Sequence, residues 1–115
     1  MLKHPLESDT YIKFSPDLKI TGLKVNCQLD AGAYQTVSGS YVGSISKKLS
    51  WTYDVPNLEY NGFTVCTNTP CSGSYRGWGG PEAALIVENM MNAAARHFKV
   101  DPIELRLRNA LPPYA

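Results

Sequence analysis

The chain has 115 residues, of which 43% are hydrophobic and 18% charged, values that suit a globular domain rather than a disordered or fibrous chain. Its formal net charge is +1 and the charges are interspersed, which argues against nucleic acid or anionic lipid as a partner. No apolar run approaches the roughly 20 residues of a membrane span, and the first residues do not resemble a secretory signal, so we expect a cytoplasmic protein with no membrane partner.

Two strand patterns joined by a turn come first in the chain. Residues 10–14 have the β-branched and aromatic content of a strand, and Pro16 and Asp17 suit a tight turn. Residues 18–29 alternate apolar and polar side chains, with Gly22 as the expected bulge or bend. These patterns predict a β-hairpin with one buried face.

The middle of the chain carries weaker signals. Residues 36–46 are rich in serine and glycine and are predicted to form a connecting loop or a short helical turn. Residues 58–67 alternate around Gly62 and predict a third strand, which leads into a glycine-rich segment.

Two helices are predicted in the last third of the chain. Apolar residues at helical spacing predict a main helix over residues 81–97. Its expected buried face consists of Ala84, Val87, Met91, Ala94, Ala95 and Phe98. A short helix is predicted from Asp101, because Pro102 suits a first helical position and Glu104 completes a capping box. We therefore predict an α+β fold, a small antiparallel β-sheet packed against one main helix plus a short C-terminal helix, in a single domain over residues 1–115.

The cysteines and histidines show neither disulfide nor metal-ligand spacing. Cys27, Cys66 and Cys71 are an odd number without a Cys-x-x-Cys pair, so we expect reduced thiols and no metal site. Cys71 lies beside the glycine-rich segment and is either a partly ionised, reactive thiol or a packed bystander. His4 and His97 are expected at surface or helix-capping positions.

The most informative segment is residues 73–82, Gly-Ser-Tyr-Arg-Gly-Trp-Gly-Gly-Pro-Glu. Its glycines permit positive φ angles and close approach of another molecule to the peptide N–H groups. Pro81 suits a first helical residue, which would place the positive end of a helix dipole beside the glycines. Arg76 offers donors to an oxyanion, and Tyr75 and Trp78 offer flat faces to a planar ring. The alternative is a sharp loop-to-helix turn, with Arg76 solvated and Trp78 filling the core.

This segment resembles the Gly-Ala-Phe-Arg-Gly-Phe-Gly-Gly-Pro-Gln loop of the xanthine dehydrogenase and aldehyde oxidase family, which touches the molybdopterin cofactor. Four further segments resemble the family in order and spacing. They are residues 30–34 (Asp-Ala-Gly-Ala-Tyr), 53–57 (Tyr-Asp-Val-Pro-Asn), 67–70 (Thr-Asn-Thr-Pro) and 101–109 (Asp-Pro-Ile-Glu-Leu-Arg-Leu-Arg-Asn). The chain departs from the family's commoner residues at Ser74, Tyr75, Trp78 and Glu82, where alanine, phenylalanine, phenylalanine and glutamine are frequent.

The resemblance implies a piece of a molybdenum hydroxylase, an oxidoreductase that hydroxylates an aldehyde or N-heterocycle and passes electrons to other cofactors. The positions implied to contact molybdopterin are Ser74, Tyr75, Arg76, Gly77 and Gly79. Trp78 is implied to flank the substrate channel. No catalytic residue and no metal ligand is assigned, because the family's acidic base lies in a motif without a counterpart in these residues.

The family's molybdenum-binding subunit is several times longer, so we expect this chain to be a fragment that is not active alone. The implied partners are the remainder of that subunit, iron-sulfur and flavin subunits or domains, and a small-molecule substrate. Two alternatives stay open. One is a non-enzymatic truncated domain or subunit-interaction piece. The other is an unrelated phosphate-binding module at the helix start, which the lack of a nearby P-loop lysine and serine disfavours.

Overall fold

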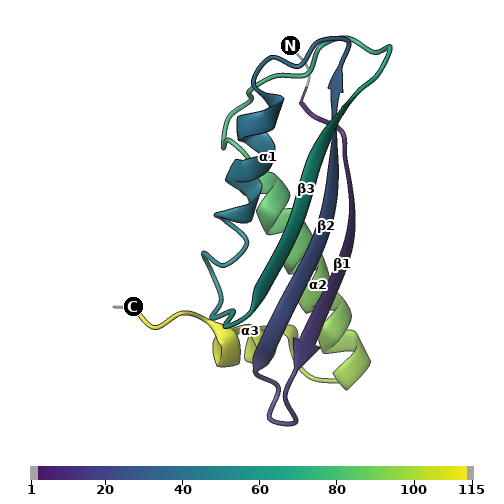
Figure 1. Cartoon of the computed structure of the whole chain (residues 1–115). Coiled ribbons are helices and arrows are strands. Elements are labelled where there is room, and N and C mark those ends of the chain that lie inside the picture. Colours follow the sequence, from purple (N-terminus) through teal and green to yellow (C-terminus); the bar gives the residue numbers. More distant parts are fainter. Residues whose placement is uncertain (1–2, 114–115) are drawn as a thin grey trace.

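The computed structural model describes residues 3–113. In these residues the elements follow the order β1 (Leu6–Phe14), β2 (Ile20–Gly32), α1 (Ser38–Ser46), β3 (Leu58–Cys66), α2 (Gly80–Phe98) and α3 (Pro102–Asn109). Figure 1 shows a single sheet with α1 and α2 packed against it, and with α3 near the end of the sheet where β1 turns into β2. The predicted α+β class, with one main helix and a short C-terminal helix, is confirmed.

Strand β2 lies at the centre of the sheet and pairs with both other strands. The predicted hairpin is confirmed, because β1 runs antiparallel to β2 with Tyr11 opposite Lys24. Strand β3 instead runs parallel to β2, with Glu59 opposite Lys24. The sheet is therefore mixed, and the expected antiparallel pairing holds only between β1 and β2. Parallel neighbours need a long crossover connection, and α1 lies within it.

Helix α1 occupies the segment for which the sequence predicts a loop or a short helical turn. Its serines and glycines have weak helix propensity, and Val37 at its N-cap makes no side-chain capping bond. The helix forms because Tyr41, Val42 and Ile45 lie on one side and are all buried in the core shared with β2 and α2. Tertiary packing here overrides local preference.

The core lies between the inner face of β2 and the helices. The covered residues of β2 are Leu23, Val25, Cys27 and Leu29, each at most 3% exposed. The buried residues of α2 are Glu82, Ala83, Ile86, Val87, Met91, Ala94 and Ala95. Two of the predicted core residues were wrong: Ala84 and Phe98 are exposed, because the covered stripe of α2 is rotated toward Ala83 and Ile86.

Helix α3 begins as the capping pattern predicts. The side chain of Asp101 accepts hydrogen bonds from the amides of Ile103 and Glu104. At the other end of α3, the buried Asn109 accepts a hydrogen bond through Oδ1 from the amide of Ile20 at 2.7 Å. This bond fixes α3 against the start of β2.

The end of β2 gives a stability test. Gly32 has a φ of +73°, and a Cβ at this position would lie 2.3 Å from the carbonyl oxygen of Pro70. We expect Gly32→Ala to lower the free energy of unfolding by more than about 2 kcal/mol, because the backbone angle and the backbone contact both oppose a side chain. The midpoint of urea unfolding measures this loss.

Gly43→Ala is the matched control. Nothing lies within 4 Å of a Cβ built at Gly43, which is in the middle of α1. Alanine there is expected to keep the stability or raise it by up to about 1 kcal/mol, since it is the better helix former. Equal losses for the two variants would contradict the role given to Gly32.

Candidate functional site

The glycine loop, residues 73–79, leads into α2 and is held by groups from α1 and the turn after it (Figure 1). The hydroxyl of Ser44 donates to the carbonyl of Trp78 at 2.6 Å. The ammonium of Lys48 donates to the carbonyl of Gly77 at 3.1 Å and also to that of Trp78. The carbonyl groups of Gly77 and Trp78 therefore face α1 and the turn that follows it.

The backbone of this loop is left-handed at three consecutive residues. The φ angles are +103° at Gly77, +40° at Trp78 and +80° at Gly79. A Cβ at Gly77 would lie 2.6 Å from Cδ of Pro81, and one at Gly79 would lie 3.1 Å from Cγ1 of Ile45. The turn itself thus requires glycine at both positions, in agreement with the sharp-turn interpretation. The groups of the loop that the turn does not require are the candidates for contact with a ligand.

Exposed backbone amides are the groups that the loop leaves free. Ser74, Tyr75, Arg76 and Gly77 are all exposed. Among residues 3–113, the N–H groups of these four residues donate no backbone hydrogen bond. The amide of the next residue, Trp78, donates to the carbonyl of Tyr75 at 3.4 Å. This stretch of four exposed residues precedes the first turn of α2, so several amides without a backbone partner lie close together in the chain.

Trp78 turns inward, whereas residues 74–77 are exposed. Its ring meets that of Tyr41 edge-on, with 5.4 Å between the centroids, and it packs against the hydrophobic core. Tyr75 is 64% exposed, and Arg76 is exposed as well. The predicted site residues therefore divide into an inward aromatic anchor and an outward face made of residues 74–77.

Sequence reasoning missed a buried polar cluster beneath the loop. His4, expected at the surface or at a cap, is 4% exposed, stacks on Tyr41 at 4.5 Å and has its Nε2 at 2.8 Å from Oγ of Ser38. Glu82 is 5% exposed in the first turn of α2. The available signal was spacing, because Glu82 lies four residues before the buried Ile86 and so shares its helix face.

Polar residues of the other segments that resemble the family stabilise the fold. Tyr53 donates to Oε1 of Glu88 at 2.6 Å, and Nε of Arg106 donates to Oε2 of the same carboxylate at 2.8 Å. Burial, reinforced by Glu88, raises the pKa of Tyr53 to about 12. Asp30 accepts a hydrogen bond from the amide of Gly32 at 2.8 Å, which lowers the pKa of Asp30. The contacts to Glu88 join the segment before β3 to α2 and α3, and the bond of Asp30 stabilises the end of β2.

The thiols and the second histidine form no cluster. In the part of the chain that the structure describes, no three His, Cys, Asp or Glu side chains are grouped to hold a metal ion. Cys27, Cys66 and Cys71 are free thiols, and burial raises the pKa of Cys27. Cys71 is half-buried, and His97 is exposed in the last turn of α2.

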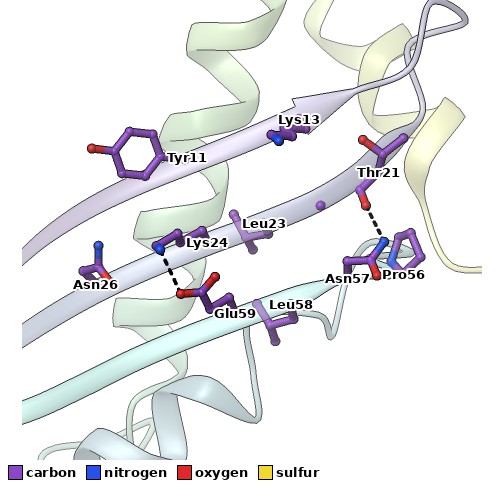
Figure 2. A pocket seen from close by; sticks show the side chains of 11 residues that line it. Tyr11, Lys13, Thr21, Leu23, Lys24, Asn26, Pro56, Asn57, Leu58 and Glu59 are labelled. Carbon is purple, nitrogen blue, oxygen red and sulfur yellow. Dashed lines mark hydrogen bonds and ion pairs between the residues drawn. The ribbon is translucent and has the colours of Figure 1, made fainter.

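A groove on the outer face of the sheet lies apart from the glycine loop. Figure 2 shows the side chains that line it on β1, β2 and β3 and on the segment just before β3, with α2 behind the sheet. Within it Lys24 and Glu59 form an ion pair at 2.8 Å, and the side-chain Nδ2 of Asn57 donates to the carbonyl of Thr21. None of the predicted site residues lines it. The glycine loop, which carries the predicted site residues, is therefore the candidate site.

Comparison with protein families identifies the chain. Residues 2–110 match the model of the molybdopterin cofactor-binding domain. The chain therefore belongs to this family, and the resemblance to xanthine dehydrogenases and aldehyde oxidases is confirmed.

Individual relatives agree with this assignment. Over 108 residues the chain is 32% identical to the nicotinate dehydrogenase large molybdopterin subunit of Eubacterium barkeri and 31% identical to a putative xanthine dehydrogenase molybdenum-binding subunit of Escherichia coli K12. Each match covers 94% of this chain. Among solved structures, the aldehyde oxidoreductase of Desulfovibrio gigas superposes with a TM-score of 0.91 at 26% identity over 97% of the chain.

The chain spans only part of each of these proteins. It covers 25% of the nicotinate dehydrogenase subunit, 14% of the xanthine dehydrogenase subunit and 12% of the aldehyde oxidoreductase. The family match therefore describes a domain-sized portion of much longer polypeptides.

The hydrogen bond from Ser44 to the loop can be tested directly. Ser44→Ala removes one donor to the carbonyl of Trp78, a bond worth about 1 kcal/mol. We expect the amides of residues 73–80 to exchange their hydrogens a few-fold faster, as measured by mass spectrometry. Ser46→Ala is the control, because its hydroxyl bonds the carbonyl of Gly43 within the same segment and not the loop. Equal acceleration in both variants would show that Ser44 does not hold the loop.

Proposed function

We propose that this chain is the portion of a molybdenum hydroxylase that contacts the molybdopterin cofactor through the glycine loop. The observation that carries the proposal is the row of four exposed residues, 74–77, whose amides donate to no backbone carbonyl among residues 3–113. On this proposal, residues 1–115 form one piece of the molybdopterin-binding domain, and the remainder of that subunit completes the pocket.

The loop's donors suit such a cofactor. A pterin carries ring nitrogen and oxygen acceptors, and molybdopterin also carries a phosphate, so the group fits a surface that presents several N–H donors and a guanidinium. Ser74, Tyr75, Arg76 and Gly77 supply these groups on the exposed stretch. Gly79 contributes by letting the loop approach α1 closely.

The residues of this chain would orient the cofactor and would not take part in the chemical step. When bound, the cofactor supplies the redox chemistry by which an aldehyde or an N-heterocycle is hydroxylated. The amides of residues 74–77 would hold it in one orientation, and the exposed Arg76 would offset negative charge. Trp78, anchored against Tyr41, would present the open part of its ring beside the substrate path. No residue of this chain is proposed as the catalytic base.

The proposed partners follow from the length of the relatives. The remainder of the molybdenum-binding subunit would complete the pocket. Iron-sulfur and flavin subunits or domains would accept the electrons. The substrate is proposed to be a small aldehyde or N-heterocycle. No helix within residues 3–113 has both the length and the apolar character needed to cross a bilayer. The cytoplasmic location expected from the sequence is kept as part of the proposal.

One observation favours the second candidate, a subunit-interaction piece without its own role in catalysis. Ile103 and Leu107 lie one helical turn apart on α3 and are 67% and 73% exposed. Such a pair is typical of a surface that another polypeptide covers. The two candidates differ in whether the glycine loop affects the cofactor content.

Cofactor content of the native assembly tests the proposal. We expect the purified assembly that contains this chain to hold molybdenum and pterin together. Arg76→Ala removes a charged donor worth roughly 1.5–3 kcal/mol and is expected to lower both contents. Gly77→Ala is expected to lower them further, because a side chain at a φ of +103° disrupts the turn. Elemental analysis and pterin fluorescence provide the two measurements.

Arg96→Ala is the matched control, since Arg96 is an exposed arginine in the last turn of α2, far along the helix from the loop. It is expected to leave both contents at the native level. An intact assembly that lacks molybdenum and pterin would contradict the cofactor role and favour the interaction piece. Full cofactor content in both loop variants would contradict the loop assignment alone.

A further inference from the structure

Strand β1 forms one edge of the sheet, on the side opposite to α1 (Figure 1). Its nine residues pair with β2 on one side, and within residues 3–113 no strand pairs with the other side. A long edge leaves a row of peptide N–H and C=O groups without partners, and native proteins cover or shorten such edges. The edge of β1 is therefore a surface with which a further strand can pair.

The register identifies the peptide groups that point outward from this edge. Just before β1, the carbonyl of Pro5 accepts from the amide of Asp30 at 3.0 Å. The next pair along the ladder, Leu6 and Leu29, is therefore a non-hydrogen-bonded pair, because the two kinds of pair alternate between antiparallel strands. The even-numbered residues of 6–12 thus direct their N–H and C=O groups away from β2.

The opposite strand agrees with this pattern. Leu23 is the register partner of Ile12, and its amide donates to the carbonyl of Asn57, on the β3 side of β2, at 2.9 Å. Leu23 and Ile12 are therefore a non-hydrogen-bonded pair as well. Among residues 3–113, the amides of residues 6, 8, 10 and 12 have no backbone partner outside the ladder.

A groove of about 480 Å³ lies between this edge and α2. Leu6 and Thr10 line it from β1, and Leu85 and Met90 line it from α2. Leu85 is 60% exposed, and the hydroxyl of Thr10 is buried without a hydrogen-bond partner within the described residues. The groove therefore offers apolar contacts beside the free peptide groups, together with one polar atom whose hydrogen bond is unmade.

The outer face of the same edge is acidic. Glu7 and Asp9 are exposed, and within residues 3–113 neither takes part in an ion pair. Their register partners on β2, Gln28 and Asn26, carry no charge. A strand placed beside β1 would therefore meet carboxylates on one face and apolar side chains on the other.

We propose that the free edge of β1 binds one further β-strand, which the remainder of the molybdenum-binding subunit supplies. Side chains alternate between the two faces of a strand. The segment that fits carries apolar residues opposite Ser8 and Thr10, where they face α2, and a lysine or arginine opposite Glu7 or Asp9.

The length of the relatives favours this source over a second copy of the chain. The chain covers no more than 25% of the relatives named above, so the same polypeptide has further segments to place beside β1. The inference shares with the proposed function the premise that the chain is part of a longer subunit. It does not depend on the glycine loop or on the cofactor.

Hydrogen exchange at single amides of β1 tests the pairing in the purified native assembly that contains this chain. Electron-transfer fragmentation in the mass spectrometer resolves neighbouring amides. We expect residues 8, 10 and 12 to exchange as slowly as residues 7, 9 and 11, which bond to β2. Exchange that alternates along the strand, with residues 8, 10 and 12 faster by on the order of 100-fold, would overturn the proposal.

Two variants of α2 separate the groove from the rest of the helix. Leu85→Lys places a charge in the groove and is expected to raise exchange at residues 8, 10 and 12 about tenfold, with residues 7, 9 and 11 unchanged. Ala84→Lys is the matched control, because Ala84 is exposed on the same helix and does not line this groove. It is expected to show native exchange. Equal exchange in the two variants would contradict a strand in the groove.

The charges of the edge have a test of their own. The double variant Glu7→Gln/Asp9→Asn keeps the side-chain shapes and removes both carboxylates. We expect exchange at residues 8 and 10 to rise a few-fold, because the basic residue of the added strand loses its partners. Native exchange in this variant would show that the segment beside β1 is not basic at these positions.

A photo-cross-link identifies the occupant. The photoreactive p-benzoylphenylalanine replaces Asn89, which is exposed and lines the groove. A cross-link to another segment of the same subunit would support the proposal. A cross-link to a second copy of this chain or to a different subunit, or no cross-link to any polypeptide, would overturn it.

Molybdenum and pterin are assayed in the same samples. Their absence from an assembly in which the edge amides are protected would contradict the proposed function and leave the strand pairing in place. Full cofactor content with an unpaired edge would contradict the strand pairing alone.

Discussion

Burial of the inner face of β2 is the interaction on which the rest of the structure depends. Its alternating apolar residues form the face of the sheet against which both α1 and α2 pack. Because the two helices pack on the same face of the sheet, the segment between β3 and α2 has to pass close to α1. The backbone at Gly79 contacts Ile45 and leaves no space for a side chain. The conformation of the glycine loop is thus a consequence of core packing, and its outward groups are placed by a rigid support.

The sequence predicted those elements of the fold that depend on residues close together in the chain. The hairpin follows from a turn and an alternating strand, and α3 follows from Asp101 and Pro102 at its start. The direction of β3 could not be predicted in this way, because it depends on α1. A segment of serines and glycines gives little helical signal, and without a helix between two strands an antiparallel pair is the natural expectation. One missed helix therefore accounts for the mixed sheet.

The candidate site shows the same division. Motif matching located the loop, but the structure separates its residues by role, with glycines that satisfy the turn, Trp78 as an inward anchor and residues 74–77 as an open face. Conversely, Tyr53 and Arg106, which also belong to matching segments, meet at the carboxylate of Glu88 and hold the scaffold. Sequence spacing does not distinguish a residue that faces a ligand from one that holds the support in place, because burial and partners are set by distant parts of the chain.

The buried charge of Glu82 changes which group of the loop can attract an electron-rich ligand. From the sequence, the positive end of the α2 dipole was the expected anion-binding element, but a carboxylate in the first turn already occupies that field. The loop carbonyls at Gly77 and Trp78 accept from Ser44 and Lys48, so the acceptor side of the loop is satisfied by the scaffold. The amides of the exposed residues 74–77, which have no backbone partner, and the guanidinium of Arg76 are left as donors. On the proposed function, attraction for a polar cofactor would therefore arise from directed hydrogen bonds at the loop, which orient a ligand, rather than from the helix dipole, which only attracts it.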